Sequence, residues 1–153
     1  MLFRLSVLLG IAIALHATPS TAQTVYPACY NIQNVQVHYY PDPSIPDIAV
    51  ARTSPNGQPI VLWNPSILMP RPAATQEFFY YHECAHHALG HALGAYGPGG
   101  ERQADCWAKQ TMIQVGVMTP QKYQTIRKDL LILSTPGIDW PNGAVRVQLL
   151  DAC

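Results

Sequence analysis

The sequence predicts an α+β fold in which a small N-terminal antiparallel sheet is followed by three helices. Two observations carry this prediction. Short stretches rich in β-branched and aromatic residues, separated by turn signals, occupy residues 30–64, whereas longer runs bounded by proline and glycine begin near residue 70. Strand-like runs that precede helix-like runs are typical of an α+β fold.

Three extended stretches predict the sheet. The first, "NVQVHYY" at residues 34–40, alternates polar and apolar side chains like a half-buried strand. The second and third are "DIAVART" at residues 47–53 and "PIVLWN" at residues 59–64, and the turn signal "SPNGQ" separates them. We therefore expect a three-stranded antiparallel meander.

Proline and glycine set the limits of the predicted helices. The first helix lies within residues 70–93, where Thr75 or a neighbour can cap its start, and "GAYGPGG" ends it. The second runs from about residue 100 to residue 115. The third is "PQKYQTIRKDLLIL", with Thr119 as N-cap and Pro120 as its first residue. Beyond it we expect a loop and then a short element of uncertain type.

Residues 1–22 have the features of a secretory signal peptide. Arg4 precedes an apolar run at residues 5–15, and the small residues Ser20 and Ala22 indicate cleavage before Gln23. The apolar run is too short to span a bilayer comfortably, so a membrane anchor is the weaker interpretation. We therefore expect one mature domain, residues 23–153, that is secreted or periplasmic and has no stable membrane span.

Charge and cysteine content limit the classes of partner and compartment. The formal net charge is zero at pH 7, so the sequence gives no reason to expect a nucleic-acid partner. Four cysteines follow the predicted cleavage site, and an even number in an exported domain favours two disulfides. They are Cys29, Cys84, Cys106 and Cys153. Three pairings of them are possible. The sequence does not indicate an oligomeric state.

The stretch "HECAHHALGH" contains the candidate site. His82 and His86 are four residues apart, which on a helix places them about 40° from one another on one face, where both imidazoles can reach a single zinc ion. Glu83 follows the first histidine and can reach a water molecule in the open position of the metal. This H-E-x-x-H pattern supplies two ligands and a general base from one helical turn.

A third ligand distinguishes the motif from a chance match on an amphipathic helix. The metzincin pattern requires glycine and histidine where this chain has Leu89 and Ala92, so that interpretation fails. "ERQADCWA" on the next predicted helix offers Glu101 as the third ligand. Asp105, four residues later, can accept a hydrogen bond from a zinc-bound histidine. Three protein ligands and a water form the usual catalytic zinc set, which favours one Zn²⁺ per chain.

"HECAHH" followed by "ERQADCWA" resembles the gluzincin zinc metallopeptidases, in particular the E-x-x-A-D variant of heat-shock and CaaX-type membrane proteases and of the small soluble minigluzincins. The resemblance covers roughly residues 75–112. It implies that His82, His86 and Glu101 bind zinc, that Glu83 is the catalytic base and that Asp105 supports a ligand.

The chain also departs from the gluzincin pattern. Membrane relatives have spanning helices and a later H-P…R element, whereas "DWPNGAVR" here has Trp140 in place of the histidine. We therefore expect Arg146 to serve as a structural ion-pair partner rather than in catalysis.

Cysteine positions on the predicted helices suggest one disulfide pairing. Cys84 lies about 200° around the helix from His82, and Cys106 lies about 140° from Glu101, so both face away from the metal. A Cys84–Cys106 bond would join the two ligand helices from behind, and Cys29 would then pair with Cys153. A different pairing is equally compatible with the sequence.

Other polar and aromatic residues have open roles. His87 and His91 form an i, i+4 pair on another face of the first helix, and we expect them to be partly exposed rather than metal-binding. Tyr80, Tyr81 and Tyr96 are possible oxyanion donors by type, but packing roles are the more common use of tyrosine.

These residues predict a secreted zinc-dependent peptidase that acts on a peptide or protein substrate. Glu83 would accept a proton from water and return it to the leaving amine. The strand at residues 58–65 is the candidate sheet edge for substrate pairing, with an interior strand as the alternative. A non-catalytic exported zinc-binding or interaction module is the alternative function, although a structural zinc site needs no base and is normally closed by a fourth protein ligand.

Overall fold

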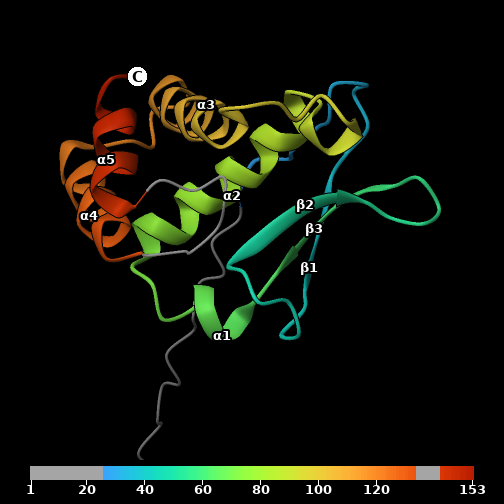
Figure 1. Ribbon diagram of the computed structural model, residues 1–153, viewed down its shortest axis with the longest axis horizontal. Helices are drawn as coiled ribbons and strands as arrows, with labels where there is room; N and C mark the ends of the chain where they lie inside the picture. The colour runs from blue at the N-terminus through green and yellow to red at the C-terminus, as the bar shows by residue number, and fades with distance from the viewer. Residues whose placement is uncertain (1–25, 134–141) are drawn as a thin grey trace, which may run out of the picture.

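The computed structural model describes residues 26–133 and 142–153, so the predicted signal peptide, residues 1–22, and Trp140 lie outside the described residues. It confirms the α+β fold, with a three-stranded sheet followed by helices. The strands are β1 (His38–Pro41), β2 (Ala49–Thr53) and β3 (Pro59–Trp63). The helices are α1 (Pro65–Leu68), α2 (Ala73–Ala88), the short 3₁₀ helix η1 (His91–Leu93), α3 (Gly100–Gln114), α4 (Pro120–Ile132) and α5 (Gly143–Asp151). Figure 1 shows α2 running through the middle of the molecule, with the sheet on one side and α3 on the other.

The sheet is mixed, and the prediction of an antiparallel meander was wrong. Its strand order is β1-β3-β2, with β1 parallel and β2 antiparallel to β3. The "SPNGQ" turn does form the predicted hairpin, since the amide of Ser54 donates to the carbonyl of Gln58 at 2.9 Å. The segment between β1 and β2, residues 42–48, forms no such turn. Asn64 instead holds it, because its side-chain amide donates to the carbonyl of Ile45 at 2.7 Å. β1 therefore pairs with β3 on the side opposite to β2.

This strand order leaves β2 at the edge of the sheet next to α2. Of the two interpretations of residues 58–65, the interior strand is the one that forms, because β3 is the central strand. The side chain of Thr53 in β2 donates to the carbonyl of Ala92 in η1 at 3.2 Å, which fixes the chain after α2 against this edge.

The predicted helices form, with small differences at their ends. The Thr119 side chain caps α4 as expected and accepts from the amide of Lys122 at 3.1 Å. The start of α2 has no side-chain cap, because the helix begins directly after Pro72, and Thr75 is buried within the first turn. The C-terminal element of uncertain type is the helix α5, which the side chain of Asn142 caps.

One apolar core joins α2 to the three following helices. Phe78, Met112, Ile126 and Leu130 have no exposed surface in the described structure. α5 packs closely on α4 because Gly143 has no side chain. A Cβ at Gly143 would lie 2.4 Å from the carbonyl oxygen of Leu130.

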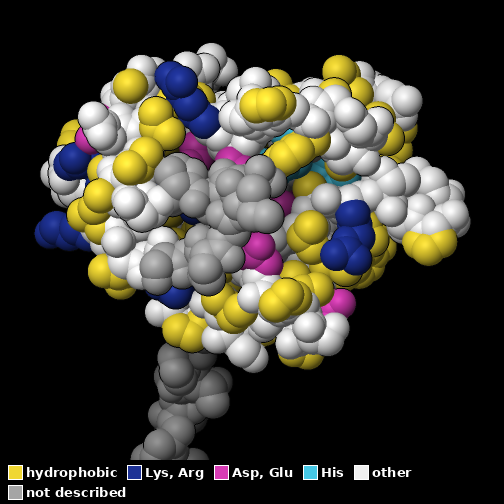
Figure 2. All heavy atoms as spheres, in the orientation of Figure 1, with side chains coloured by type: hydrophobic (Ala, Val, Ile, Leu, Met, Phe, Trp, Pro, Cys, Tyr) yellow, Lys and Arg dark blue, Asp and Glu magenta, His cyan; other side chains and the backbone are white. Residues whose placement is uncertain are grey.

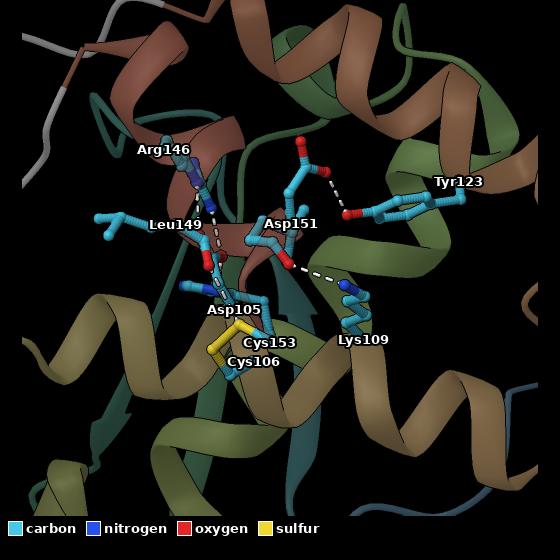
Figure 3. The surroundings of a disulfide bond; sticks show 10 residues. Asp105, Cys106, Lys109, Tyr123, Arg146, Leu149, Asp151 and Cys153 are labelled. Atoms are coloured by element: carbon cyan, nitrogen blue, oxygen red, sulfur yellow. Dashed lines mark hydrogen bonds and ion pairs between the residues drawn. A yellow bond between two sulfur atoms is a disulfide. The ribbon is translucent and has the colours of Figure 1, made fainter.

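Two disulfides form, and their pairing differs from the one suggested by helix geometry. Cys29 pairs with Cys84, and Cys106 pairs with Cys153. The suggested Cys84–Cys106 bond was wrong because α2 and α3 are each bonded to a cysteine distant in the sequence, Cys29 and Cys153. Figure 3 shows how the Cys106–Cys153 bond connects α3 to the end of α5. The amine of Lys109 in α3 also donates to the carbonyl of Leu150 in α5, at 2.8 Å.

We expect replacement of both Cys106 and Cys153 by alanine to lower the free energy of unfolding by about 2–4 kcal/mol, because the bond closes a long loop in the unfolded chain. The two residues are 47 positions apart. Urea unfolding of the oxidised parent and the double variant measures the difference. An unchanged midpoint would show that the other α3–α5 contacts alone hold α5.

Two further features bear on the compartment. Within residues 26–133 and 142–153, no helix has the length and hydropathy needed to cross a membrane. Both disulfides are compatible with an oxidising extracellular environment.

Candidate metal centre

The three predicted ligands meet in the structure. His82 and His86 project from one face of α2, and Glu101 projects from the first turn of α3. One ligand atom from each residue lies within 4.8 Å of the others. Nε2 of His82 is 3.1 Å from Nε2 of His86 and 3.2 Å from Oε2 of Glu101. This group could hold a metal ion.

Asp105 fixes the orientation of the His82 ring, as the sequence predicted. Its Oδ1 lies 2.8 Å from Nδ1 of His82. Arg146 in α5 holds the same carboxylate through two hydrogen bonds, from Nε at 2.8 Å and from a terminal nitrogen at 2.7 Å (Figure 3). The expectation that Arg146 is an ion-pair partner is confirmed, and its partner is the carboxylate that also contacts His82.

The hydrogen-bond directions suit a cation. Asp105 accepts from Nδ1 of His82, so a His82 ring that gives up its second proton to bind a metal offers the lone pair of Nε2. Two imidazole nitrogens and a carboxylate oxygen then converge as three acceptor atoms, and this set suits a metal ion such as zinc.

Without a metal, burial, hydrogen bonds and neighbouring charges shift the pKa values of these groups. Burial would lower the pKa of His82, but hydrogen bonds to Asp105 and Glu101 raise it to about 9. Burial lowers the pKa of His86. Burial would raise the pKa of Glu101, yet its contacts with the two histidines hold it well below its usual range. Burial likewise opposes ionisation of Asp105, but Arg146 keeps the pKa of that carboxyl low.

Glu83 lies beside His82 and lines the same pocket as Ala51 in β2. The backbone of Ala51 is near enough to the Glu83 carboxylate to lower its pKa slightly. Burial raises the pKa of Glu83 to about 7 against the lowering effects of His82 and Ala51, and the negative charges of Glu101 and Asp47 add to the rise. A carboxyl with a pKa near neutrality is suited to accept and release a proton.

The cluster opens into a pocket of about 180 Å³. β2 and the segment before it form one wall, and α2, η1 and the start of α3 form others. Tyr96, Leu133 and Arg146 complete the lining. Figure 2 shows histidine and acidic side chains between hydrophobic groups on this face of the molecule. The wall from the sheet consists of Asp47, Ile48, Ala49, Val50 and Ala51.

His91 contacts the site, contrary to the expectation from the sequence. The prediction assumed that the first helix continues through residue 93, which would turn His91 away. α2 instead ends at Ala88, and Gly90, with φ 79°, redirects the chain into η1. Nδ1 of His91 then lies 3.1 Å from Nδ1 of His86. Gly90 was the signal for this, since glycine at this place commonly ends a helix.

His87 serves the fold rather than the metal. Its Nε2 lies 2.9 Å from the carbonyl oxygen of Ile60, which joins α2 to the central strand. His87 is buried, as is His91, so the expectation that both are partly exposed was wrong.

Tyr96 is the one of the three candidate tyrosines that lines the pocket. Its hydroxyl donates to Oε1 of Glu101 at 2.8 Å, and its ring stacks on His86. A Cβ at Gly100 would lie 2.9 Å from this ring, so glycine makes room for it. Tyr80 instead stacks between Tyr26 and Tyr39, and Tyr81 packs in the core.

The chain has no significant match to a protein family, to a characterised protein or to a solved structure. The functional argument therefore depends on the residues and their geometry.

Proposed function

We propose that the protein is a zinc-dependent peptidase of the gluzincin type, with His82, His86 and Glu101 as zinc ligands and Glu83 as general base and acid. The observation that carries this proposal is the convergence of three acceptor atoms beside a buried carboxyl group in an open pocket. A purely structural zinc site would need neither Glu83 nor access to solvent.

The chain's own groups would divide the work of hydrolysis. A zinc ion held by the three ligands would supply Lewis acidity, which polarises a carbonyl group and makes water more acidic. Glu83 accepts the proton of the attacking water and then donates it to the amine that leaves. Asp105 holds the His82 ring in the tautomer with its proton on Nδ1, and Tyr96 hydrogen-bonds to Glu101.

The edge of β2 supports a peptide as the substrate. The amide of Asn64 donates to the carbonyl of Ile48 and the amide of Ser54 to that of Gln58, so these are hydrogen-bonded pairs of the ladder. Hydrogen-bonded pairs alternate with non-hydrogen-bonded pairs along two antiparallel strands. Ala49 and Ala51 belong to the second kind, so their backbone groups point away from β3. The outward backbone group of Ala51 lies near the carboxylate of Glu83. An extended peptide added to this edge would pass the catalytic carboxyl.

The proposed location is outside the cytoplasm, secreted or periplasmic. Two disulfides in a chain that begins with the features of a signal peptide support this location.

The test combines zinc content with cleavage of a denatured protein substrate. We expect one zinc per chain, cleavage by the zinc-loaded protein, loss of cleavage after chelation and its return with one equivalent of zinc. Zinc binding without cleavage of any denatured substrate would favour the alternative, an exported zinc-binding or interaction module. No zinc binding would refute the metal centre itself.

A further inference from the structure

We propose that His91 and Gln103 form a relay that positions the ligand His86 by fixing the tautomer of its ring. The inference extends the proposed zinc site and depends on metal binding, but not on peptide hydrolysis. His91 and Gln103 act through His86 and are positioning residues.

The side chains of His86, His91 and Gln103 form a chain of hydrogen bonds. Nε2 of His91 lies 3.2 Å from Oε1 of Gln103, and Nδ1 of His91 lies 3.1 Å from Nδ1 of His86. An amide oxygen only accepts, so Nε2 of His91 donates to it. A neutral imidazole has one proton, so Nδ1 of His91 is the acceptor for a proton on Nδ1 of His86. Nε2 of His86 then carries a lone pair, and this is the atom that faces His82 and Glu101.

The reverse direction would disable the ligand. If the Gln103 side chain donated instead, Nδ1 of His91 would carry the proton and donate to His86. The proton of His86 would then sit on Nε2, where the metal must bind. The relay therefore selects the one tautomer of His86 that can coordinate through Nε2.

The two histidine ligands are thus supported differently. A buried carboxylate, Asp105, accepts from His82, whereas a neutral relay accepts from His86 and ends at Gln103, which is exposed. Partners of this kind orient metal-bound histidines and raise the metal affinity.

The fold places His91 independently of any metal. The amide of Gly90 donates to the carbonyl of His87 at 3.1 Å, and η1 begins at His91. Thr53 holds η1 to β2, as described above, and the Tyr96 ring packs edge-on against His91. These contacts belong to the fold, and none of them involves a metal ligand.

Exchanges at Gln103 test the relay without disturbing the core, because this residue is exposed. Gln103→Leu removes the acceptor, and Gln103→Glu keeps an acceptor and cannot donate when ionised. We expect Gln103→Leu to weaken zinc binding about 10-fold to 100-fold and Gln103→Glu to bind zinc at least as tightly as the parent. Competition with a chromophoric zinc chelator measures the affinities.

Gln110→Leu is the matched control, because Gln110 is also an exposed glutamine of α3, seven residues further on. It should bind zinc like the parent. Equal zinc affinity of the parent and Gln103→Leu would overturn the relay, and so would an equal loss in Gln103→Leu and Gln103→Glu.

A spectroscopic readout separates tautomer control from general stabilisation. In the zinc-loaded parent, long-range ¹⁵N–¹H correlations should place the His86 proton on Nδ1 and the His91 proton on Nε2. His91→Asn provides an acceptor near the former Nδ1 and should retain most of the zinc affinity, whereas His91→Leu should lose it. A His91 proton on Nδ1 in the zinc-loaded parent would overturn the proposal. A parent that binds zinc with the expected tautomers but cleaves nothing would refute only the peptidase function.

Discussion

Replacement of Glu83 by glutamine is expected to leave one zinc ion per chain and to lower the rate of peptide hydrolysis by about 10²–10⁴-fold, the usual contribution of a general acid–base group. The amide keeps the size of the side chain and can still contact the backbone of Ala51, but it cannot take a proton from water. In the metal-free protein burial raises the pKa of this carboxyl to about 7, so the pocket allows the group both to hold and to release a proton. Zinc content and initial rates on a denatured substrate measure the two effects.

Glu77→Gln is the matched control for this variant. Glu77 lies on the same helix, but its partner is Lys122 in α4, and neither residue lines the pocket. We expect this exchange to leave hydrolysis unchanged and to cost little stability, because the Lys122 side chain is partly exposed. Full activity in Glu83→Gln would rule out the proposed base, and loss of zinc in that variant would show that Glu83 supports the metal instead.

Much of the candidate centre follows from local spacing. Helical periodicity alone places His82 and His86 on one face of α2, and a second helix begins at Gly100, as the glycine-rich stretch predicted. Glu101 and Asp105 then fall on one face of α3. The contact between the two helices required only a reversal of the chain, which the intervening loop allows.

Features that depend on distant parts of the chain could not be predicted in the same way. The Asn64 side chain holds the segment between β1 and β2, residues 42–48, and no turn motif in the sequence predicts these contacts. Cysteine pairing depends on where the two ends of the chain dock. The prediction for His91 was wrong because several glycines could end the helix. The helix ends five residues earlier than residue 93, at Ala88, and this brings His91 into the site.

The C-terminal helix shows why such long-range contacts matter to the site. Cys153, just after α5, is bonded to Cys106, the residue of α3 that follows Asp105. Arg146, the ion-pair partner of Asp105, lies in α5. Figure 3 shows the disulfide and the Arg146–Asp105 ion pair between the same two helices. The orientation of His82 therefore depends on how α5 docks, although α5 supplies no ligand.

Arg146→Met is accordingly expected to lower the free energy of unfolding by about 3–5 kcal/mol, the usual cost of breaking a buried ion pair from one side. The side chains of Arg146 and Asp105 are each only 5% exposed, so water cannot replace the lost partner. Methionine fills much of the apolar space, including the contact with the Phe79 ring, so the loss reports on the charge. Urea unfolding of the metal-free protein measures it.

Two comparisons separate this charge effect from a loss of packing. The pair Arg127–Asp151 has side chains 33% and 39% exposed, so Arg127→Met should cost less than about 1 kcal/mol. In the double variant Asp105→Asn, Arg146→Met no charge remains unpaired, and the asparagine oxygen can still accept from His82. We therefore expect the double variant to be more stable than Arg146→Met alone. If the two are equally unstable, Arg146 holds α5 through packing rather than by neutralising the carboxylate behind His82.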